Sequence, residues 1–211
     1  YNQSSRGFDI NVKPVWEEYT VGNPDVIVSV VDDGIDLKHE DLAANCLASN
    51  HYNAVTGTSY IKAGDHGTHV AGTIAAVSNN GKGVAGIAGG DKAKGLPGVK
   101  LMSCQIFQEN ADGSTTGVGG AAGIKWGADH GAVISQNSWG YNFDANGDGE
   151  LTGEEYTKAM NARIQASDKA AIDYFIKYAG CDNNGNQLPN SPMKGGVVIF
   201  AAGNDNIANG A

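Results

Sequence analysis

The sequence predicts an α/β fold: a doubly wound, mostly parallel sheet with helices on both faces. Two observations support this prediction. Runs rich in Val and Ile show little alternation of apolar and polar residues, as expected of parallel strands covered on both faces. These runs alternate with stretches of helical character, which is the order found in doubly wound sheets. The strands are expected at 26–31, 99–106, 132–137 and 196–202, and the helices at about 66–77, 117–130 and 154–179.

The elements follow one another without a linker or an internal repeat, and 211 residues suit a single domain with a sizeable core. Residues 11–20 predict a short first helix, with Asn11 as a possible N-cap. The first predicted strand then leads into Asp32, and the next helix begins with His66. The small residues that would let this helix pack closely on a sheet are Gly67, Ala71 and Gly72.

Composition and charge limit the partners of the protein. With 14 basic and 23 acidic residues, the formal net charge is −9, which argues against nucleic acid or an anionic membrane as a partner. The same charge suits a protein that attracts metal ions or basic peptides. No apolar run approaches the length of about 20 residues that a membrane-spanning helix needs. No signal peptide is recognisable in the chain either.

Three cysteines leave the disulfide pattern open. Cys104 lies in the apolar segment KLMSCQIF and is expected to be a buried thiol. Cys46 and Cys181 lie in polar, loop-like surroundings. There they could bond to each other or to a part of the protein outside this chain.

An aspartate and a histidine stand where they could act on each other. Asp32 follows an apolar strand and precedes Gly34, at the carboxyl end, where open α/β sheets carry functional groups. A neutral imidazole such as that of His66 takes a proton from a hydroxyl only when its other nitrogen is held in the right tautomer, which a buried aspartate achieves. Asn204 follows the last predicted strand, and its amide could donate to a developing oxyanion. Each residue alone suggests only a turn or a cap, so the combination carries the prediction.

A second motif, DANGDGELTGEE at 144–155, fits the loop pattern of an EF-hand calcium site at every fixed position. The expected Ca²⁺ ligands are Asp144, Asn146, Asp148, the backbone carbonyl of Glu150, and Glu155. The residues that follow predict an exiting helix, whereas the preceding SWGYNF does not look helical. We therefore expect a lone, structural Ca²⁺ loop. The simpler interpretation is a solvated acidic turn that caps the next helix.

The segments VIVSVVDDGID, DHGTHVAGT and IFAAGND resemble the subtilisin-like serine proteases (subtilases), and the resemblance covers nearly the whole chain. It implies that Asp32 is the orienting acid, His66 the general base and Asn204 the oxyanion donor. In this family the nucleophilic serine comes last, yet no G-T-S-x-A motif follows Asn204. Residues 1–211 would then be the N-terminal and central portion of one catalytic domain, and the missing C-terminal part would carry the serine.

The resemblance implies a serine endopeptidase that hydrolyses peptide bonds in peptide or protein substrates. It also implies a propeptide and an extracytoplasmic location: secreted, periplasmic or at the cell surface. A function from a different class stays open, namely a noncatalytic, Ca²⁺-binding module that keeps the scaffold to bind peptides. Because a scaffold has no need of Asp32, His66 and Asn204 together, their retention favours the enzyme. A serine nucleophile in the rest of the domain would discriminate between the two.

The resemblance implies a second Ca²⁺ site in the segment AAVSNNGKGV. The implied ligands are the Asp41 carboxylate, the Asn80 side-chain amide, and the backbone carbonyls of Val77, Lys82 and Val84. The interpretation without a metal is an ordinary Asn-Gly turn.

The Asp-Asp-Gly sequence at Asp33 matches kexin- and furin-like relatives, whose second aspartate faces a basic residue of the substrate. Their acidic residue just past the SWG turn is not matched, because Tyr141, Asn142 and Phe143 stand there. A preference for basic residues is therefore left open. By resemblance, the SWG segment forms one wall of the primary specificity pocket, which the Ca²⁺ loop would stiffen, and DGSTTG pairs with extended substrate. The expected substrate-binding residues are Asp33, Gly117, Ser138, Trp139 and Gly140.

Overall fold

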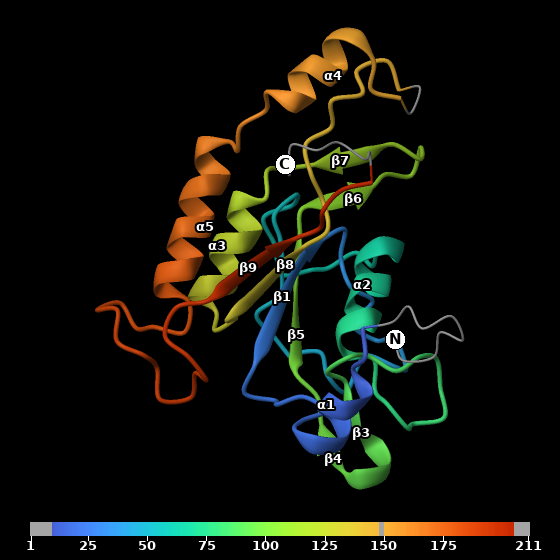
Figure 1. Cartoon of the computed structure of the whole chain (residues 1–211), viewed down its shortest axis with the longest axis vertical. Coiled ribbons are helices and arrows are strands. Elements are labelled where there is room, and N and C mark those ends of the chain that lie inside the picture. The colour runs from blue at the N-terminus through green and yellow to red at the C-terminus, as the bar shows by residue number, and fades with distance from the viewer. Residues whose placement is uncertain (1–9, 148–149, 205–211) are drawn as a thin grey trace.

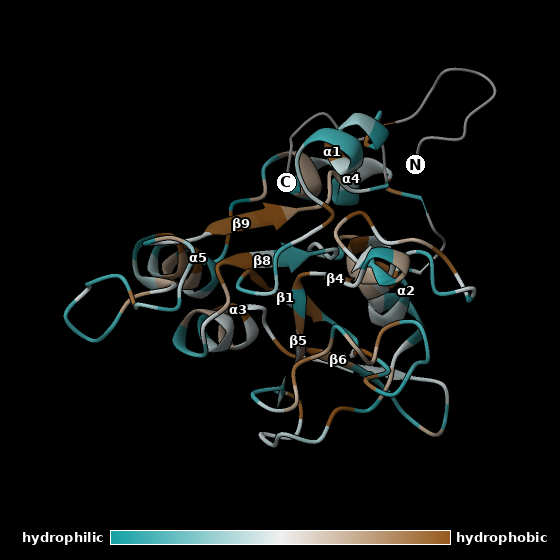
Figure 2. Ribbon diagram, turned by 90° about the horizontal axis from the view of Figure 1, so that it is seen from below, coloured by the Kyte–Doolittle hydropathy of each residue, from teal (hydrophilic) through white to brown (hydrophobic). Residues whose placement is uncertain are grey.

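A five-stranded parallel sheet forms the centre of the protein in the computed structural model, which describes residues 10–147 and 150–204. The strand order is β2–β5–β1–β8–β9. Helix α2 covers one face of the sheet, while α3 and α5 cover the other (Figures 1 and 2). The predicted α/β architecture is therefore confirmed. The bounds are β1 Ile27–Asp32, β2 Tyr52–Asn53, β5 Lys100–Gln105, β8 Ile134–Asn137, β9 Val197–Phe200, α2 Asp65–Ala75, α3 Ala121–Asp129 and α5 Ala166–Tyr178.

Alternation along β1 divides the interior into two cores. Val28 and Val30 are buried in a cluster that includes Ala71 and Ala75 of α2. Val31, one residue further on, belongs to the opposite cluster with residues of α3 and α5. Successive side chains of a strand point to opposite faces, so one strand supplies both layers. This arrangement leaves Asp32 at the carboxyl end of a strand that is buried on both sides.

Smaller elements surround the sheet. Two two-stranded ribbons pair β3 with β4 and β6 with β7, and Figure 1 shows α4 standing apart from the sheet, beyond α5. Among the described residues, no helix is both long and apolar enough to cross a membrane. The bounds are α1 Lys13–Glu18, β3 Gly90–Asp91, η1 Lys92–Lys94, β4 Leu96–Pro97, β6 Phe107–Glu109, β7 Thr115–Gly117 and α4 Gly153–Met160.

Two predicted helix starts were wrong. Helix α1 begins at Lys13 with Val12 at the N-cap, and Asn11 has φ of 50°, so Asn11 is not the cap. The helix expected over 117–130 begins only at Ala121, because Gly117 is paired with Phe107 in the β6–β7 ribbon. Tertiary pairing here overrides the local helical pattern.

The single helix expected over 154–179 is two helices, α4 and α5. In a continuous helix, the Gln165 N–H would donate to the Asn161 carbonyl. Instead it donates to the Tyr141 hydroxyl at 2.9 Å. The Asn161 carbonyl accepts from the Arg163 guanidinium at 3.2 Å. Both partners of the missing helical bond are thus satisfied elsewhere.

All three cysteines are free thiols in the structure, so Cys46 and Cys181 are not bonded to each other. Cys104 lies on β5 and is fully buried, as predicted. Burial raises the pKa of the Cys104 thiol to about 12, which makes it a poor nucleophile at neutral pH.

Candidate active site

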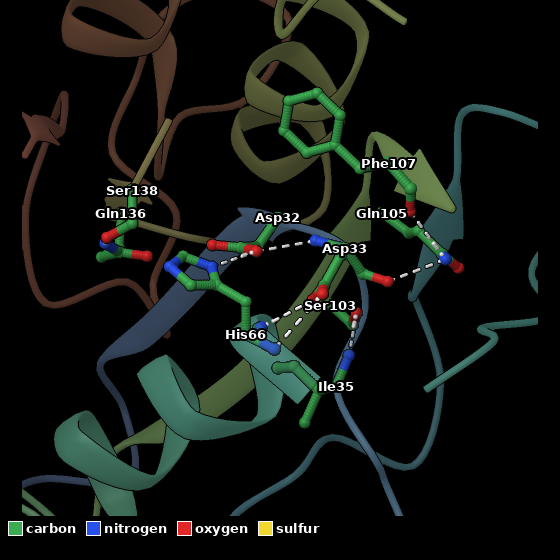
Figure 3. Close-up of polar contacts among 10 residues, drawn as sticks. Asp32, Asp33, Ile35, His66, Ser103, Gln105, Phe107, Gln136 and Ser138 are labelled. Atoms are coloured by element: carbon green, nitrogen blue, oxygen red, sulfur yellow. Dashed lines mark hydrogen bonds and ion pairs between the residues drawn. The ribbon is translucent and has the colours of Figure 1, made fainter. Parts of the chain in front are cut away.

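Asp32 and His66 are in direct contact. Asp32 is the last residue of β1 and its side chain is 3% exposed, whereas the His66 side chain, in the first turn of α2, is 59% exposed. The imidazole Nδ1 lies 2.8 Å from Asp32 Oδ1, and Figure 3 shows the ring turned toward the carboxylate. Because a carboxylate accepts hydrogen bonds, the proton belongs on Nδ1. In the neutral ring, the lone pair on Nε2 is then free to accept a proton.

The contact shifts both pKa values. Burial raises the pKa of Asp32, and the hydrogen bond from His66 opposes this rise. Its Oδ2 is buried and has no hydrogen-bond partner within residues 10–147 and 150–204. The hydrogen bond to Asp32 raises the pKa of His66 above its ordinary 6.5, against a smaller effect of burial. The raised pKa of His66 therefore contributes stability that is fully present below pH 6.5 and is lost as the pH rises through the folded-state pKa of His66.

Asp33 holds the start of the helix that carries His66. Its Oδ2 accepts from the His66 N–H at 3.2 Å, and its Oδ1 accepts from the Gly67 N–H at 2.6 Å. The carboxylate lies so close to Gly64 that a Cβ there would be 2.2 Å from Asp33 Cγ. Asp33, expected to face substrate, thus caps α2 from a distant segment, the role usually played by a residue at the N-cap itself.

We expect Asp33→Ala to destabilise the protein by about 1 kcal/mol, because it leaves two N–H groups of the first helical turn without their acceptor. Urea denaturation measures this change. Asp65→Ala is the matched control, since it removes the same charge from the first turn of α2. An equal loss in the two variants would mean that charge near the helix end, and not capping, explains the effect.

A buried glutamine holds the backbone of Asp33 in place. Gln105, the fully buried last residue of β5, donates from Nε2 to the Asp33 carbonyl at 2.8 Å and to the Phe107 carbonyl at 2.9 Å. Its Oε1 accepts from Asn53 Nδ2 and from the Lys62 N–H. Sequence reasoning missed this residue. The available signal was a glutamine inside an otherwise apolar strand, where a polar side chain must find internal partners.

The expected substrate-binding residues follow neighbouring strands. Ser138, Trp139 and Gly140 come directly after β8, and Ser138 Oγ accepts from Gln136 Nε2 at 2.6 Å. Figure 3 shows Gln136 and Ser138 beside the His66 ring. Gly117 ends β7 and pairs with Phe107. Because the strands of the main sheet are parallel, the segment after β8 lies with Asp32 at the edge of the sheet formed by the carboxyl ends of the strands.

Asn204 also lies at this edge. It is exposed and follows β9, which is parallel to β8 and is separated from β1 by that strand. The three predicted catalytic residues therefore lie at one edge of the sheet, with Asp32 and His66 in contact. The preceding Gly203 has φ of 83°, a left-handed conformation that turns the chain just before the asparagine.

Acidic side chains of the 144–155 loop accept hydrogen bonds from the backbone of the same loop. Asp144 Oδ1 accepts from the Gly147 N–H at 2.7 Å, and Glu155 Oε1 reaches back to the Ala145 N–H at 2.9 Å. The first and last expected ligands therefore both turn toward the loop backbone. Helix α4 follows, with Thr152 at its N-cap, and no helix precedes the loop in 138–147. Asn146 and Glu150 lie in the same loop, while Asp148 lies outside the described residues.

The residues predicted for the second metal site lie near Asp41. The Asp41 side chain is buried; its Oδ1 accepts from Asn80 Nδ2 at 2.6 Å and its Oδ2 from the Val84 N–H at 2.9 Å. The Val77 N–H bonds the Asp41 carbonyl, and the Lys82 N–H bonds Asn80 Oδ1. Hydrogen bonds thus link all five expected residues, but those of Val77, Lys82 and Val84 run through their N–H groups and not through the carbonyls expected as ligands.

The side chains expected as ligands in both loops carry oxygen atoms, the ligand type that a hard cation would require. In the part of the chain that the structure describes, no three His, Cys, Asp or Glu side chains gather into a metal-holding group. A metal at Asp41 would therefore rely mainly on amide and carbonyl oxygens, which Ca²⁺ accepts readily. The Asn80 amide would have to turn its oxygen toward the ion, because its nitrogen now donates to Asp41.

Comparisons with known proteins show what this chain resembles. Fervidolysin of Fervidobacterium pennivorans is 42% identical over 136 residues, covering 60% of this chain and 18% of its own length. Its crystal structure gives a TM-score of 0.55 at 30% identity and covers 95% of this chain and 24% of its own. The halolysin-like extracellular serine protease Nep of Natrialba magadii is 35% identical over 147 residues, covering 66% of this chain and 25% of Nep.

Relatives that process dibasic sites are also found. The dibasic-processing endoprotease of Schizosaccharomyces pombe is 36% identical over 110 residues, covering 50% of this chain and 15% of its own length. The chain thus spans a quarter or less of the curated relatives named here. A family model, Peptidase_S8, described as the subtilase family, matches residues 23–211. The chain belongs to the subtilase family of serine proteases.

Proposed function

We propose that this chain supplies the acid, the base and the oxyanion donor of a serine endopeptidase, and that a serine outside residues 1–211 supplies the nucleophile. The observation that carries the proposal is the 2.8 Å contact between His66 Nδ1 and Asp32 Oδ1. It holds the imidazole with Nε2 as the proton acceptor, the tautomer that a general base requires.

In the proposed steps His66 first accepts and then donates a proton, while Asp32 and Asn204 stabilise charge. His66 Nε2 takes the proton of the serine hydroxyl as its oxygen attacks the substrate carbonyl carbon, and Asp32 stabilises the imidazolium. The Asn204 amide donates to the oxyanion, a contact worth about 10²–10³ in kcat in this family. His66 then gives its proton to the leaving amine as the peptide C–N bond breaks. Water hydrolyses the acyl-enzyme by the same proton route.

The test is labelling of the intact protein with a fluorophosphonate probe, followed by mass spectrometry to locate the modified serine. We expect a labelling rate that rises with pH through the raised pKa of His66, because the base must be neutral. A labelled serine within residues 1–211 would contradict the proposed placement of the nucleophile. No labelling at any pH would favour a noncatalytic peptide-binding module.

We also propose that Ca²⁺ binds the 144–155 loop and the Asp41 loop. When bound, the ion would supply the positive charge that holds the loop oxygens together. The 144–155 loop begins four residues after the SWG segment. A loop held in place by the ion would therefore help to hold the proposed substrate wall in place. We therefore expect Ca²⁺ removal to weaken substrate binding before it unfolds the sheet, and loss of both at the same Ca²⁺ concentration would refute this order.

Glu155→Gln should remove most of the stabilisation that Ca²⁺ gives through the 144–155 loop. At a Ca²⁺ concentration 100 times the Kd, one site stabilises the fold by about 2.7 kcal/mol. Thermal melts with and without Ca²⁺ measure this difference. Glu154→Gln is the matched control, because Glu154 is the adjacent carboxylate and, among the described residues, makes only a long contact with Lys158 at 4.0 Å. An equal Ca²⁺ response in the two variants would remove Glu155 from the ligand set.

Other partners follow from the surface and the relatives. Among the residues that the structure describes, β9 is an edge strand of the sheet, and Val197, Ile199 and Phe200 are about half exposed. We propose that the remainder of the catalytic domain covers this edge. Peptide or protein substrates, a propeptide and an extracytoplasmic location are proposed with it, the last supported by the extracellular relative Nep. A preference for basic residues has the dibasic-processing relative in its favour, but both Asp33 oxygens already accept hydrogen bonds.

A further inference from the structure

Asp168 is a buried carboxylate that joins two helices. It is 1% exposed and lies in the first turn of α5. Its Oδ1 accepts from the Ala121 N–H at 3.0 Å, the first residue of α3. The N-terminal ends of both helices favour negative charge. A buried carboxylate is costly unless it is paired or hydrogen-bonded, so its second oxygen also needs a partner.

That partner is Tyr141, which lies just before the 144–155 loop. The Tyr141 hydroxyl donates to Asp168 Oδ2 at 2.9 Å and accepts from the Gln165 N–H at 2.9 Å. Burial, together with Asp168, raises the pKa of Tyr141, so the hydroxyl keeps its proton and remains a donor. The Tyr141 hydroxyl thereby joins the two ends of the segment 141–165. This segment contains the 144–155 loop.

The same cluster reaches the proposed substrate wall. A Cβ on Gly120 would lie 2.2 Å from Trp139 Cζ2, so the indole lies directly on the residue before α3. Trp139 Nε1 is buried and finds no acceptor among the residues that the structure describes. The indole is therefore held by packing, against Gly120 and edge-on against Phe200 at 5.2 Å. A shift of the α3 start would move the indole with it.

We propose that Tyr141 and Asp168 are positioning residues for substrate binding, which fix the SWG wall against the start of α3 and couple both to the 144–155 loop. Neither side chain contacts the Asp32–His66 pair through a hydrogen bond in the described structure, so they would act on the wall and not on the chemistry. The role in substrate binding rests on the proposed function. The hydrogen bonds that Tyr141 and Asp168 make with each other and with the starts of α3 and α5, called the clasp below, do not depend on that function.

The test compares Tyr141→Phe with Tyr174→Phe in the intact protein. Tyr174 is the matched control, because its hydroxyl also bonds a carboxylate across α5 and α3, Asp129 Oδ1 at 2.7 Å. For Tyr141→Phe we expect a several-fold rise in KM, reduced selectivity among peptides that differ in the residue before the cleaved bond, and nearly unchanged kcat. For Tyr174→Phe we expect wild-type values. Hydrogen exchange should quicken in 118–122, 138–141 and 163–166 only in Tyr141→Phe.

Each outcome separates the clasp from the proposed function. Unchanged hydrogen exchange in Tyr141→Phe would overturn the clasp itself. Faster exchange with unchanged KM and selectivity would overturn the role in substrate binding. If the wild-type protein is not labelled by a fluorophosphonate, the proposed function fails, and hydrogen exchange still decides the clasp. The Phe variant keeps the ring, so it preserves the packing of the wild-type side chain and loses only the hydroxyl.

Discussion

Asp32→Asn should lower kcat by about 10⁴-fold, the scale known for this position in serine proteases with such a triad, this family included. An amide donates where the carboxylate accepts, so the imidazole would turn its unprotonated nitrogen toward residue 32 and lose its acceptor for the serine proton. The same change removes the largest cause of the raised His66 pKa. The pH at which activity appears should therefore move down.

Steady-state hydrolysis of a peptide substrate by the intact protein, from pH 5 to 9, measures both effects. Asp36→Asn is a suitable control, because this carboxylate accepts from the Lys38 N–H within the same turn and makes no contact with His66. Equal losses in the two variants would mean that Asp32 supports the turn and does not orient the base. An unchanged fluorophosphonate labelling rate in Asp32→Asn would contradict the triad outright.

Phe175→Ala should destabilise the protein by about 3–5 kcal/mol, the cost of removing a buried aromatic side chain from a core that cannot close over the cavity. The ring is 0% exposed in the cluster between the sheet and the helices α3 and α5. Glycines make room for it: a Cβ on Gly196 would lie 2.5 Å from Phe175 Cε1, and one on Gly127 would lie 3.3 Å from Cε2. Backbone surrounds the ring on these sides, so little can move in to fill the space.

Urea unfolding followed by circular dichroism tests this prediction. Ile176→Ala is the matched control, because Ile176 is the next residue of the same helix and is 52% exposed. Both changes replace an apolar side chain of α5 by alanine, but only the first opens a cavity. A loss below about 1 kcal/mol in Phe175→Ala would contradict the proposed packing, since surface substitutions already reach about 0.5 kcal/mol.

Sequence reasoning predicted the sheet and the acid–base pair because these depend on local signals. Apolar runs define the strands, and parallel strands bring their carboxyl ends to one edge, so Asp32 and the residues after β8 and β9 could be expected together. The contact of His66 with Asp32 required only that α2 return to that edge. The bounds of the long strands were accurate to within about two residues for the same reason.

The parts that could not be predicted depend on long-range partners. Nothing local shows that Asp33 reaches residues 66 and 67, because a residue after a strand normally serves its own turn. The break between α4 and α5 required the Tyr141 hydroxyl, which lies 24 positions away in sequence from Gln165. Ser103 and Gln105 were passed over within an apolar run, yet Ser103 Oγ accepts from the Ile35 N–H and Gln105 holds the Asp33 carbonyl.

The buried thiol of Cys104 has a kinetic consequence for the active site. Cys104 and Gln105 are successive residues of β5, paired in register with Val31 and Asp32 of β1. A thiol reagent can reach Cys104 only when the core between the sheet and α3 opens. An opening that separates β5 from β1 also withdraws Gln105 from Asp33. The rate of Cys104 modification, with the half-buried Cys46 and Cys181 blocked beforehand, would therefore set an upper limit on how long the core beneath the acid–base pair stays closed between openings.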